Sequence, residues 1–206
     1  MPKKRIIKFR NVSKRILILC EGKYTEPLYF KGIRKSVSLK NKLSALRIEI
    51  YDSEKNTGKE LVEEAKFLMK EAKQDKNDYE EVWIVIDKDG YTKFPQTFDN
   101  AYKIKIKIAF SIVAFEIWFL LHFRYTSKYY HNYSELEKDL IKEISDYSKS
   151  NDNLYEILKG RMEFAIQNAK KLNLFVETDI QNGKKHYELN CSYTNVHELV
   201  SLLHNL

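Results

Sequence analysis

Apolar and polar positions follow two patterns along the first 123 residues. Residues 16–20 and 82–86 are each five consecutive apolar residues followed by turn residues. Such runs are typical of strands buried on both faces of a parallel sheet. Residues 46–51 and 104–112 alternate between apolar and polar positions, which indicates two further strands.

Helical patterns lie between and after these strands. Residues 58–73 place apolar side chains three or four positions apart, which predicts an amphipathic helix. Helices are also expected from Thr25, near Pro95 and over residues 114–123. Because strands and helices alternate, we expect an α/β fold with a parallel sheet flanked by helices.

The pattern becomes helical from about residue 124. Ser134 begins a Ser-Glu-Leu-Glu sequence that resembles a capping box and predicts a helix through Ile144. Further helices are expected over residues 155–172 and from Asn195. We therefore expect three parts, namely a basic arm (1–15), a sheet domain (16–123) and a C-terminal helical extension packed on it (124–206).

The net charge of +7 comes from one end of the chain. Residues 1–15 contain seven Lys or Arg residues and no acid, so the rest of the chain has as many basic as acidic residues. Such an arm can neutralise phosphates and bind nucleic acid without sequence preference. It can equally serve as a solubilising tail.

Composition excludes several classes of protein. No apolar stretch approaches the roughly 20 residues needed to span a bilayer, and the basic N-terminus lacks the apolar segment of a secretory signal. Cys20 and Cys191 lack the spacing of a zinc site or a disulfide framework. We expect a cytoplasmic protein without membrane contact.

Acidic residues follow two of the predicted strands directly. Glu21 follows the first strand, and Asp87 and Asp89 follow the 82–86 strand. Ligands collect at the carboxyl ends of parallel strands, and three carboxylates there would form an oxygen cage for Mg²⁺ or Mn²⁺. Two such charges about 4 Å apart repel by roughly 4 kcal/mol at an effective dielectric near 20, and a divalent ion reverses that cost.

The predicted metal ligands are therefore Glu21, Asp87 and Asp89, and Glu21 could alternatively act as a general base. A metal ion held there could orient a phosphodiester, polarise its phosphoryl oxygen and activate water. The alternative is that the three residues are solvated turn acids.

Other catalytic motifs are missing from the sequence. Gly22-Lys23 and Gly58-Lys59 lack the spacing of a P-loop. There is no H-E-x-x-H motif and no nucleophile elbow, and the segment after residue 86 lacks the later ligands of an EF-hand. The five histidines show no metal-ligand spacing, and His122 is interpreted as a core or rim residue rather than a catalytic one.

Glu116 interrupts an apolar segment, so its charge should be paired or directed at a metal ion. Two interpretations stay open, a buried salt bridge and a catalytic role. Glu26, on the first predicted helix, is a weaker candidate whose charge could instead complement the helix N-terminus.

Two basic stretches suggest contact with nucleic acid. Lys103, Lys105 and Lys107 alternate with isoleucines, which would place them on one face of a strand. Residues 124–133 interleave basic and aromatic side chains that can follow phosphates and stack on bases. The predicted nucleic-acid contacts are Lys103, Lys105, Arg124 and Lys128. Alternatively, the lysines protect a sheet edge and the tyrosines pack the extension.

Three segments carry a family resemblance. They read ILCEGKYTEPLYF from Ile18, VWIVIDKD from Val82 and AFEIWFLLHF from Ala114. The first two resemble the Toprim pattern of a glutamate strand and a D-x-D strand, and the third resembles the F-E-x-W-x-L-L-H-F signature of the bacterial RloB family. One departure is the sequence from Ser111 to Ala114, where that family usually has Asn-Pro.

The resemblance implies a Toprim-like fold and a Mg²⁺-dependent nuclease that acts in phage defence, with an ABC/AAA-type ATPase as partner. It also implies that Glu116 belongs to the active site with Glu21, Asp87 and Asp89. We expect a nuclease that cuts DNA or RNA. The alternatives are a non-catalytic Toprim-like module that binds nucleic acid or regulates the ATPase, and a different phosphotransfer or nucleotidyl reaction at the same site.

Overall fold

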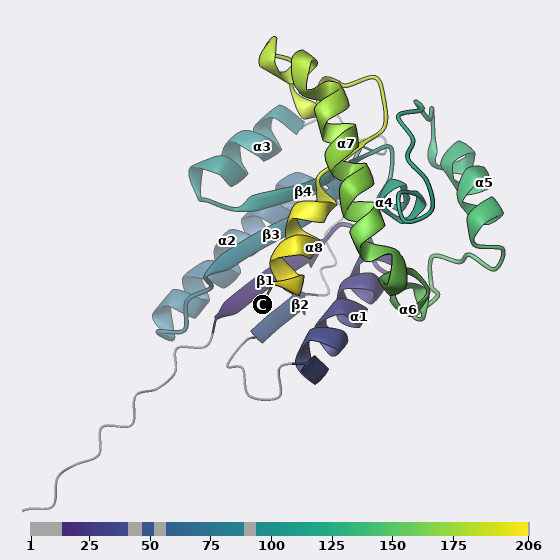
Figure 1. Ribbon diagram of the computed structural model, residues 1–206. Coiled ribbons are helices and arrows are strands. Elements are labelled where there is room, and N and C mark those ends of the chain that lie inside the picture. The colour runs from purple at the N-terminus through teal and green to yellow at the C-terminus, as the bar shows by residue number, and fades with distance from the viewer. Residues whose placement is uncertain (1–13, 41–46, 52–56, 89–93, 206) are drawn as a thin grey trace, which may run out of the picture.

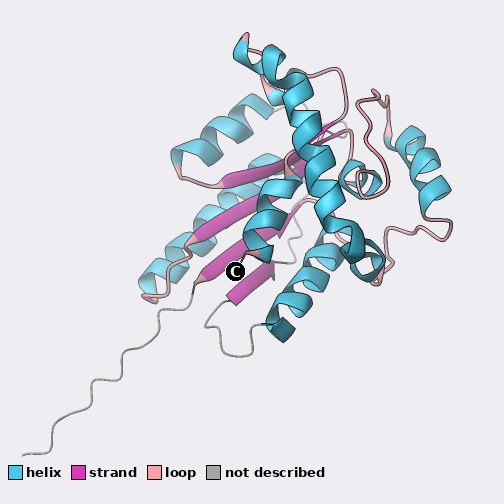
Figure 2. Cartoon of the chain, in the orientation of Figure 1, coloured by secondary structure: helices cyan, strands magenta, loops and turns pink. Residues whose placement is uncertain are grey.

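The protein contains a five-stranded, mostly parallel sheet covered by helices on both faces (Figures 1 and 2). The computed structural model describes residues 14–40, 47–51, 57–88 and 94–205. The strands are β1 (Arg15–Cys20), β2 (Arg47–Tyr51), β3 (Glu81–Asp87), β4 (Lys107–Ile112) and β5 (Tyr193–Thr194). They lie in the order β2-β1-β3-β4-β5. Only β5 runs antiparallel to its neighbour among these strands.

The helices alternate with the first four strands and then follow one another. They are α1 (Thr25–Lys40), α2 (Gly58–Gln74), α3 (Phe94–Lys103), α4 (Glu116–Leu120), α5 (Tyr133–Glu143), α6 (Leu154–Leu158), α7 (Met162–Gln181) and α8 (Val196–His204). The predicted α/β fold, with a parallel sheet flanked by helices and a mainly helical C-terminal part, is confirmed. No helix in the described part of the chain is long and apolar enough to cross a membrane.

Both faces of the sheet are buried, which explains the continuous apolar runs. Ile16 and Ile18 of β1 pack into a core with α1, α4 and α8, whereas Leu17 and Leu19 pack into a second core with α2 and α3. A strand that contributes to two cores cannot alternate between apolar and polar residues.

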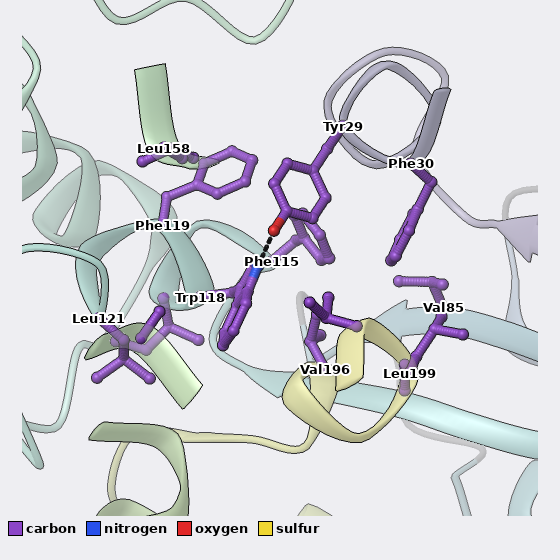
Figure 3. Close-up of a cluster of buried hydrophobic side chains, with 14 of the residues drawn as sticks. Tyr29, Phe30, Val85, Phe115, Trp118, Phe119, Leu121, Leu158, Val196 and Leu199 are labelled. Carbon is purple, nitrogen blue, oxygen red and sulfur yellow. Dashed lines mark hydrogen bonds between the residues drawn. The ribbon is translucent and has the colours of Figure 1, made fainter. Parts of the chain in front are cut away.

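An aromatic cluster fixes α4 against α1 (Figure 3). The indole Nε1–H of Trp118 donates to the hydroxyl of Tyr29 over 2.8 Å, and both side chains are fully buried. Phe115 and Phe119 contact the Tyr29 ring with centroid distances of 5.8 and 5.3 Å. Because the hydroxyl and the indole satisfy each other, the cluster sets the relative position of the two helices without an unpaired polar group.

The lysine-rich stretch does not form the strand that its alternation predicts. Helix α3 continues through Lys103, and Lys105 has a left-handed backbone with φ of 60°. The N–H groups of Ile104 and Ile106 both bond to the carbonyl of Ala101, which turns the chain before β4 begins at Lys107. The prediction that these lysines share one strand face is therefore wrong.

Several boundaries also differ from the predicted ones. Strand β1 starts at Arg15, whose buried guanidinium forms three hydrogen bonds with the Glu49 carboxylate at 2.8 to 3.0 Å. The N-cap of α5 is Asn132 rather than Ser134, because Asn132 Oδ1 accepts the Glu135 N–H over 3.1 Å.

The C-terminal part is not entirely helical, since β5 joins the sheet beside β4. Residues 1–13 of the predicted basic arm lie outside the described residues. The division into an arm, a sheet domain and an extension stays a prediction.

Candidate carboxylate site

Glu21 and Asp87 lie side by side at the carboxyl edge of the sheet. The register pairs Cys20 with Val85, so Glu21 and Asp87 leave adjacent strands at nearly the same level. The Asp87 N–H donates to Glu21 Oε2 over 3.4 Å, and the Phe115 N–H donates to Asp87 Oδ2 over 3.3 Å. The structure thus brings together two of the acids that the sequence placed at strand ends.

Two further acids reach the same place from helices. Glu26 on α1 and Glu116 on α4 are both buried, with 6% and 2% of their surface exposed. Together with Glu21 and Asp87 they line a cavity of about 280 Å³. The rest of its lining comes from Gly22, Lys23, Tyr24, Thr25 and Lys149.

Gly22 allows Glu26 to occupy this position. A Cβ atom at residue 22 would lie 2.0 Å from Glu26 Oε2 and 2.6 Å from its carboxyl carbon. Any larger residue would therefore displace the Glu26 carboxyl group. The Glu-Gly pair after β1 supplies one acid and the space for a second.

The cavity is electrostatically unfavourable for its acids. The pKa of Glu26 is raised to about 8, first by burial and then by the negative charge of Asp87, with smaller contributions from Glu116 and Glu21. Burial penalises the charged form, and neighbouring carboxylates add to that penalty. A cation bound among these groups would relieve the repulsion.

Glu116 is both paired and part of the cavity. Its Oε1 accepts a hydrogen bond from the Tyr147 hydroxyl over 2.8 Å and lies 3.7 Å from the Lys149 ammonium. Burial and the Glu116 charge raise the pKa of Tyr147 well above its usual range, so this hydroxyl stays protonated and acts as a donor. The salt-bridge interpretation is confirmed, because Lys149 pairs with Glu116. Glu116 also lines the cavity with the other acids, and its catalytic role stays a prediction.

The carboxylate set suits a hard divalent ion in chemistry, since Mg²⁺ prefers oxygen ligands. However, among the residues the structure describes, no group of three or more His, Cys, Asp or Glu side chains is arranged to hold a metal ion. Asp89, the third predicted ligand, lies outside those residues. Glu21 and Asp87 would thus supply two of the three predicted metal ligands, and the metal site stays a prediction.

The predicted nucleic-acid contacts lie elsewhere and differ in their surroundings. Arg124 and Lys128 both pair with the buried Asp139, at 3.3 and 3.0 Å. Lys103 and Lys105 precede β4, at the opposite end of the strand from Ser111, the partner of Asp87. At about 3.3 Å per residue, even Lys107, the first residue of β4, lies roughly 13 Å from that edge. Lys103 and Lys105 come before it in the chain. None of these four side chains lines the carboxylate cavity, and their role in binding stays a prediction.

His122 belongs to the core rather than to the cavity. It is fully buried, its Nδ1 lies 2.9 Å from the Trp118 carbonyl oxygen, and its ring packs edge-on against the Trp118 ring. Burial lowers its pKa to about 4, so the imidazole is neutral near pH 7. This environment agrees with the interpretation of His122 as a core residue.

Sequence reasoning missed Lys149, which lines the cavity, and Tyr147, which bonds to Glu116, and it undervalued Glu26. Tyr147 and Lys149 lie in the connection between α5 and α6, where no pattern indicated a functional role. Glu26 had a usable signal, since an acid in the first turn of a helix that follows a strand lies at the carboxyl edge of the sheet.

The fold and the cavity describe an α/β protein with clustered acids at the carboxyl edge of a parallel sheet. Comparison with protein families gives a match to the model described as RloB-like protein over residues 16–203. The chain therefore belongs to the RloB-like family, as the sequence resemblance indicated. A search of curated proteins found no match.

Proposed function

We propose that this protein is a metal-dependent nuclease that hydrolyses phosphodiester bonds of DNA or RNA at the carboxylate cavity. The observation that carries the proposal is the convergence of Glu21, Glu26, Asp87 and Glu116 on one cavity. Burying mutually repelling acids costs free energy, so these acids do not stabilise the fold by themselves. A role in binding a cation explains them.

In this proposal Glu21, Asp87 and Asp89 hold Mg²⁺ or Mn²⁺. The bound ion would polarise a phosphoryl oxygen and favour a hydroxide nucleophile at neutral pH. Glu116 is held by Tyr147 and shapes the wall of the cavity beside these ligands. Glu26, fixed against Gly22, adds a further carboxyl group in reach of the same space.

The family membership supports the wider biological proposal. As a member of the RloB-like family, the protein would act in the bacterial cytoplasm as an effector of phage defence, together with an ABC/AAA-type ATPase. No membrane contact is part of this proposal.

A second candidate function is a non-catalytic Toprim-like module that binds nucleic acid or regulates the ATPase. The observation that favours it is that the described residues, which do not include Asp89, contain no group of three or more side chains arranged to hold a metal ion. In that case the acids would shape a binding surface instead of a catalytic centre.

Cleavage assays separate the two functions. Purified protein is incubated with labelled DNA and with tRNA, with and without Mg²⁺ or Mn²⁺, alone and with the ATPase. We expect metal-dependent cleavage that falls by roughly a hundredfold or more in Asp87→Ala. Asp152→Ala, at an exposed position of the extension, is the matched control. Absence of cleavage under all conditions, or equal cleavage by Asp87→Ala, would contradict a nuclease.

A further inference from the structure

Lys149 supplies an ammonium group at the rim of the carboxylate cavity, although it lies more than 30 residues beyond Glu116 in the sequence. Its side chain is 52% exposed and its Nζ lies 3.7 Å from Glu116 Oε1. It lines the cavity together with all four acids. A phosphate that entered the cavity from solvent would therefore meet this group.

The position of Lys149 is fixed by contacts on both sides. Its Nζ lies 3.6 Å from the centre of the Tyr133 ring, within the range of a cation–π interaction. Its carbonyl oxygen accepts a hydrogen bond from Thr25 Oγ1 over 3.4 Å, which ties this segment to the start of α1. Tyr147, two residues earlier, bonds to Glu116. These contacts reduce the entropy that a flexible lysine would lose on binding a ligand.

The hydrogen-bonding capacity of the ammonium is not used by Glu116. A separation of 3.7 Å is too long for a hydrogen bond, which requires about 2.7 to 3.2 Å between nitrogen and oxygen. The near oxygen of Glu116 already accepts from Tyr147. An ammonium has three donors, so Lys149 is oriented by its neighbours while its donors stay available.

We propose that Lys149 binds a phosphate of the nucleic-acid substrate and so makes the segment between α5 and α6 part of the active site. This inference rests on the proposed nuclease function, because it assigns the phosphate to the same cavity. The acids alone would repel a phosphodiester. A cation among them and a fixed ammonium at the rim together give a surface that attracts one.

Binding measured without cleavage tests this role. A short labelled single-stranded DNA and an RNA of the same sequence are titrated in Ca²⁺, and fluorescence anisotropy is recorded at several salt concentrations. We expect Lys149→Met to weaken binding roughly tenfold and to reduce the slope of log K against log salt by about 0.7. Lys149→Arg should retain most of the affinity, since it keeps the charge and the donors.

The matched control is Lys138→Met, which removes the same charge from an exposed position of α5. Equal affinity and salt slope for Lys149→Met and Lys138→Met would overturn the inference, as would a wild-type protein that binds neither oligonucleotide. Circular dichroism of Lys149→Met checks that it is folded, and Lys149→Arg provides the second variant.

The two proposals fail in different ways. If the wild type cleaves in Mg²⁺ while Lys149→Met binds and cleaves equally well, the role of Lys149 is wrong and the nuclease stands. If the wild type binds through Lys149 but never cleaves, the nuclease is wrong and the phosphate-binding role stands.

Discussion

The acids of the carboxylate cavity and the buried Asp139 of α5 have opposite environments. In the carboxylate cavity, Glu26 lies among Asp87, Glu116 and Glu21, and its pKa is raised to about 8. On α5, Asp139 is also buried, but it accepts hydrogen bonds from Lys142, Lys128 and Tyr130 at 2.7 to 3.0 Å. These donors, Lys142 first, hold the pKa of Asp139 well below its usual range.

The two environments differ in how much positive charge the fold places beside the acid. Asp139 carries its own counter-charges and links α5 to the preceding loop through Arg124 and Lys128. The four cavity acids share two lysines, Lys23 and Lys149, and Lys149 lies beyond hydrogen-bonding distance of Glu116. An acid cluster that the fold leaves short of positive charge is suited to bind a cation from solution.

The largest effect is expected from removing the charge of Asp139. Asp139→Asn should lower the free energy of unfolding by about 2 kcal/mol, because it weakens several charge-assisted hydrogen bonds at once. The difference should be measured by urea unfolding at pH 7. Asp152→Asn, at an exposed position of the same part of the chain, should change stability by less than about 0.5 kcal/mol.

The same variant has a defined pH dependence. The folded-state pKa of Asp139 lies below the unfolded value near 3.8, so its stabilisation is present above about pH 4 and is lost as the pH falls further. The gap between wild type and Asp139→Asn should therefore stay constant from pH 7 to about pH 5 and narrow below about pH 4. A gap that disappeared already near pH 6 would contradict this account of Asp139.

A smaller effect should come from the binding of Mg²⁺ at the cavity. At a free Mg²⁺ concentration ten times its Kd, the folded protein should gain about 1.4 kcal/mol of stability. Asp87→Asn should abolish this gain. Without Mg²⁺, Asp87→Asn should be as stable as the wild type or more stable, since it removes a charge that raises the pKa of Glu26.

Thermal unfolding with and without Mg²⁺ measures both parts of this prediction. Asp139→Asn is the comparison, because it should keep the full Mg²⁺ effect despite its lower stability. Equal Mg²⁺ stabilisation of the wild type and Asp87→Asn would show that the ion binds elsewhere.

The sheet and two of the four cavity acids could be predicted from one feature of the sequence. Long apolar runs determine which strands are buried, and the position after such a run determines which acids meet at the carboxyl edge. Glu21 and Asp87 could be placed together on that basis, and the structure brings them into contact. Neither step requires knowledge of how the helices pack.

Contacts that depend on packing could not be read in this way. Lys149 reaches the cavity because the segment after α5 passes the start of α1, where the Thr25 hydroxyl bonds to the Lys149 carbonyl. This segment carries no periodic pattern. Arg124 and Lys128 have the composition of a nucleic-acid surface, yet Asp139, 11 residues beyond Lys128, pairs with both. The prediction that the alternating lysines share a strand face was wrong because Lys105, with its positive φ, lies in a turn before β4.

The smallest expected effect tests whether the position of Glu26 matters. Gly22→Ala would place a methyl group 2.0 Å from Glu26 Oε2, so the carboxyl group must move within the cavity or leave it. If all four acids act together, metal-dependent cleavage should fall roughly fivefold, which corresponds to about 1 kcal/mol in the transition state. Initial cleavage rates at saturating Mg²⁺ measure this change.

Two other glycines make matched controls for Gly22→Ala. Nothing lies within 4 Å of a Cβ atom at Gly160, whereas one at Gly32 would approach the Tyr155 Cβ to 2.5 Å. Gly160→Ala should leave both cleavage and stability unchanged, and Gly32→Ala should lower stability by about 1 to 3 kcal/mol through overpacking. If Gly22→Ala leaves cleavage and stability unchanged, as Gly160→Ala should, Glu26 is not part of the functional site. If Gly22→Ala instead lowers stability but cleaves normally per folded molecule, Gly22 is a packing residue. Glu26 would then have a structural role, like Asp139.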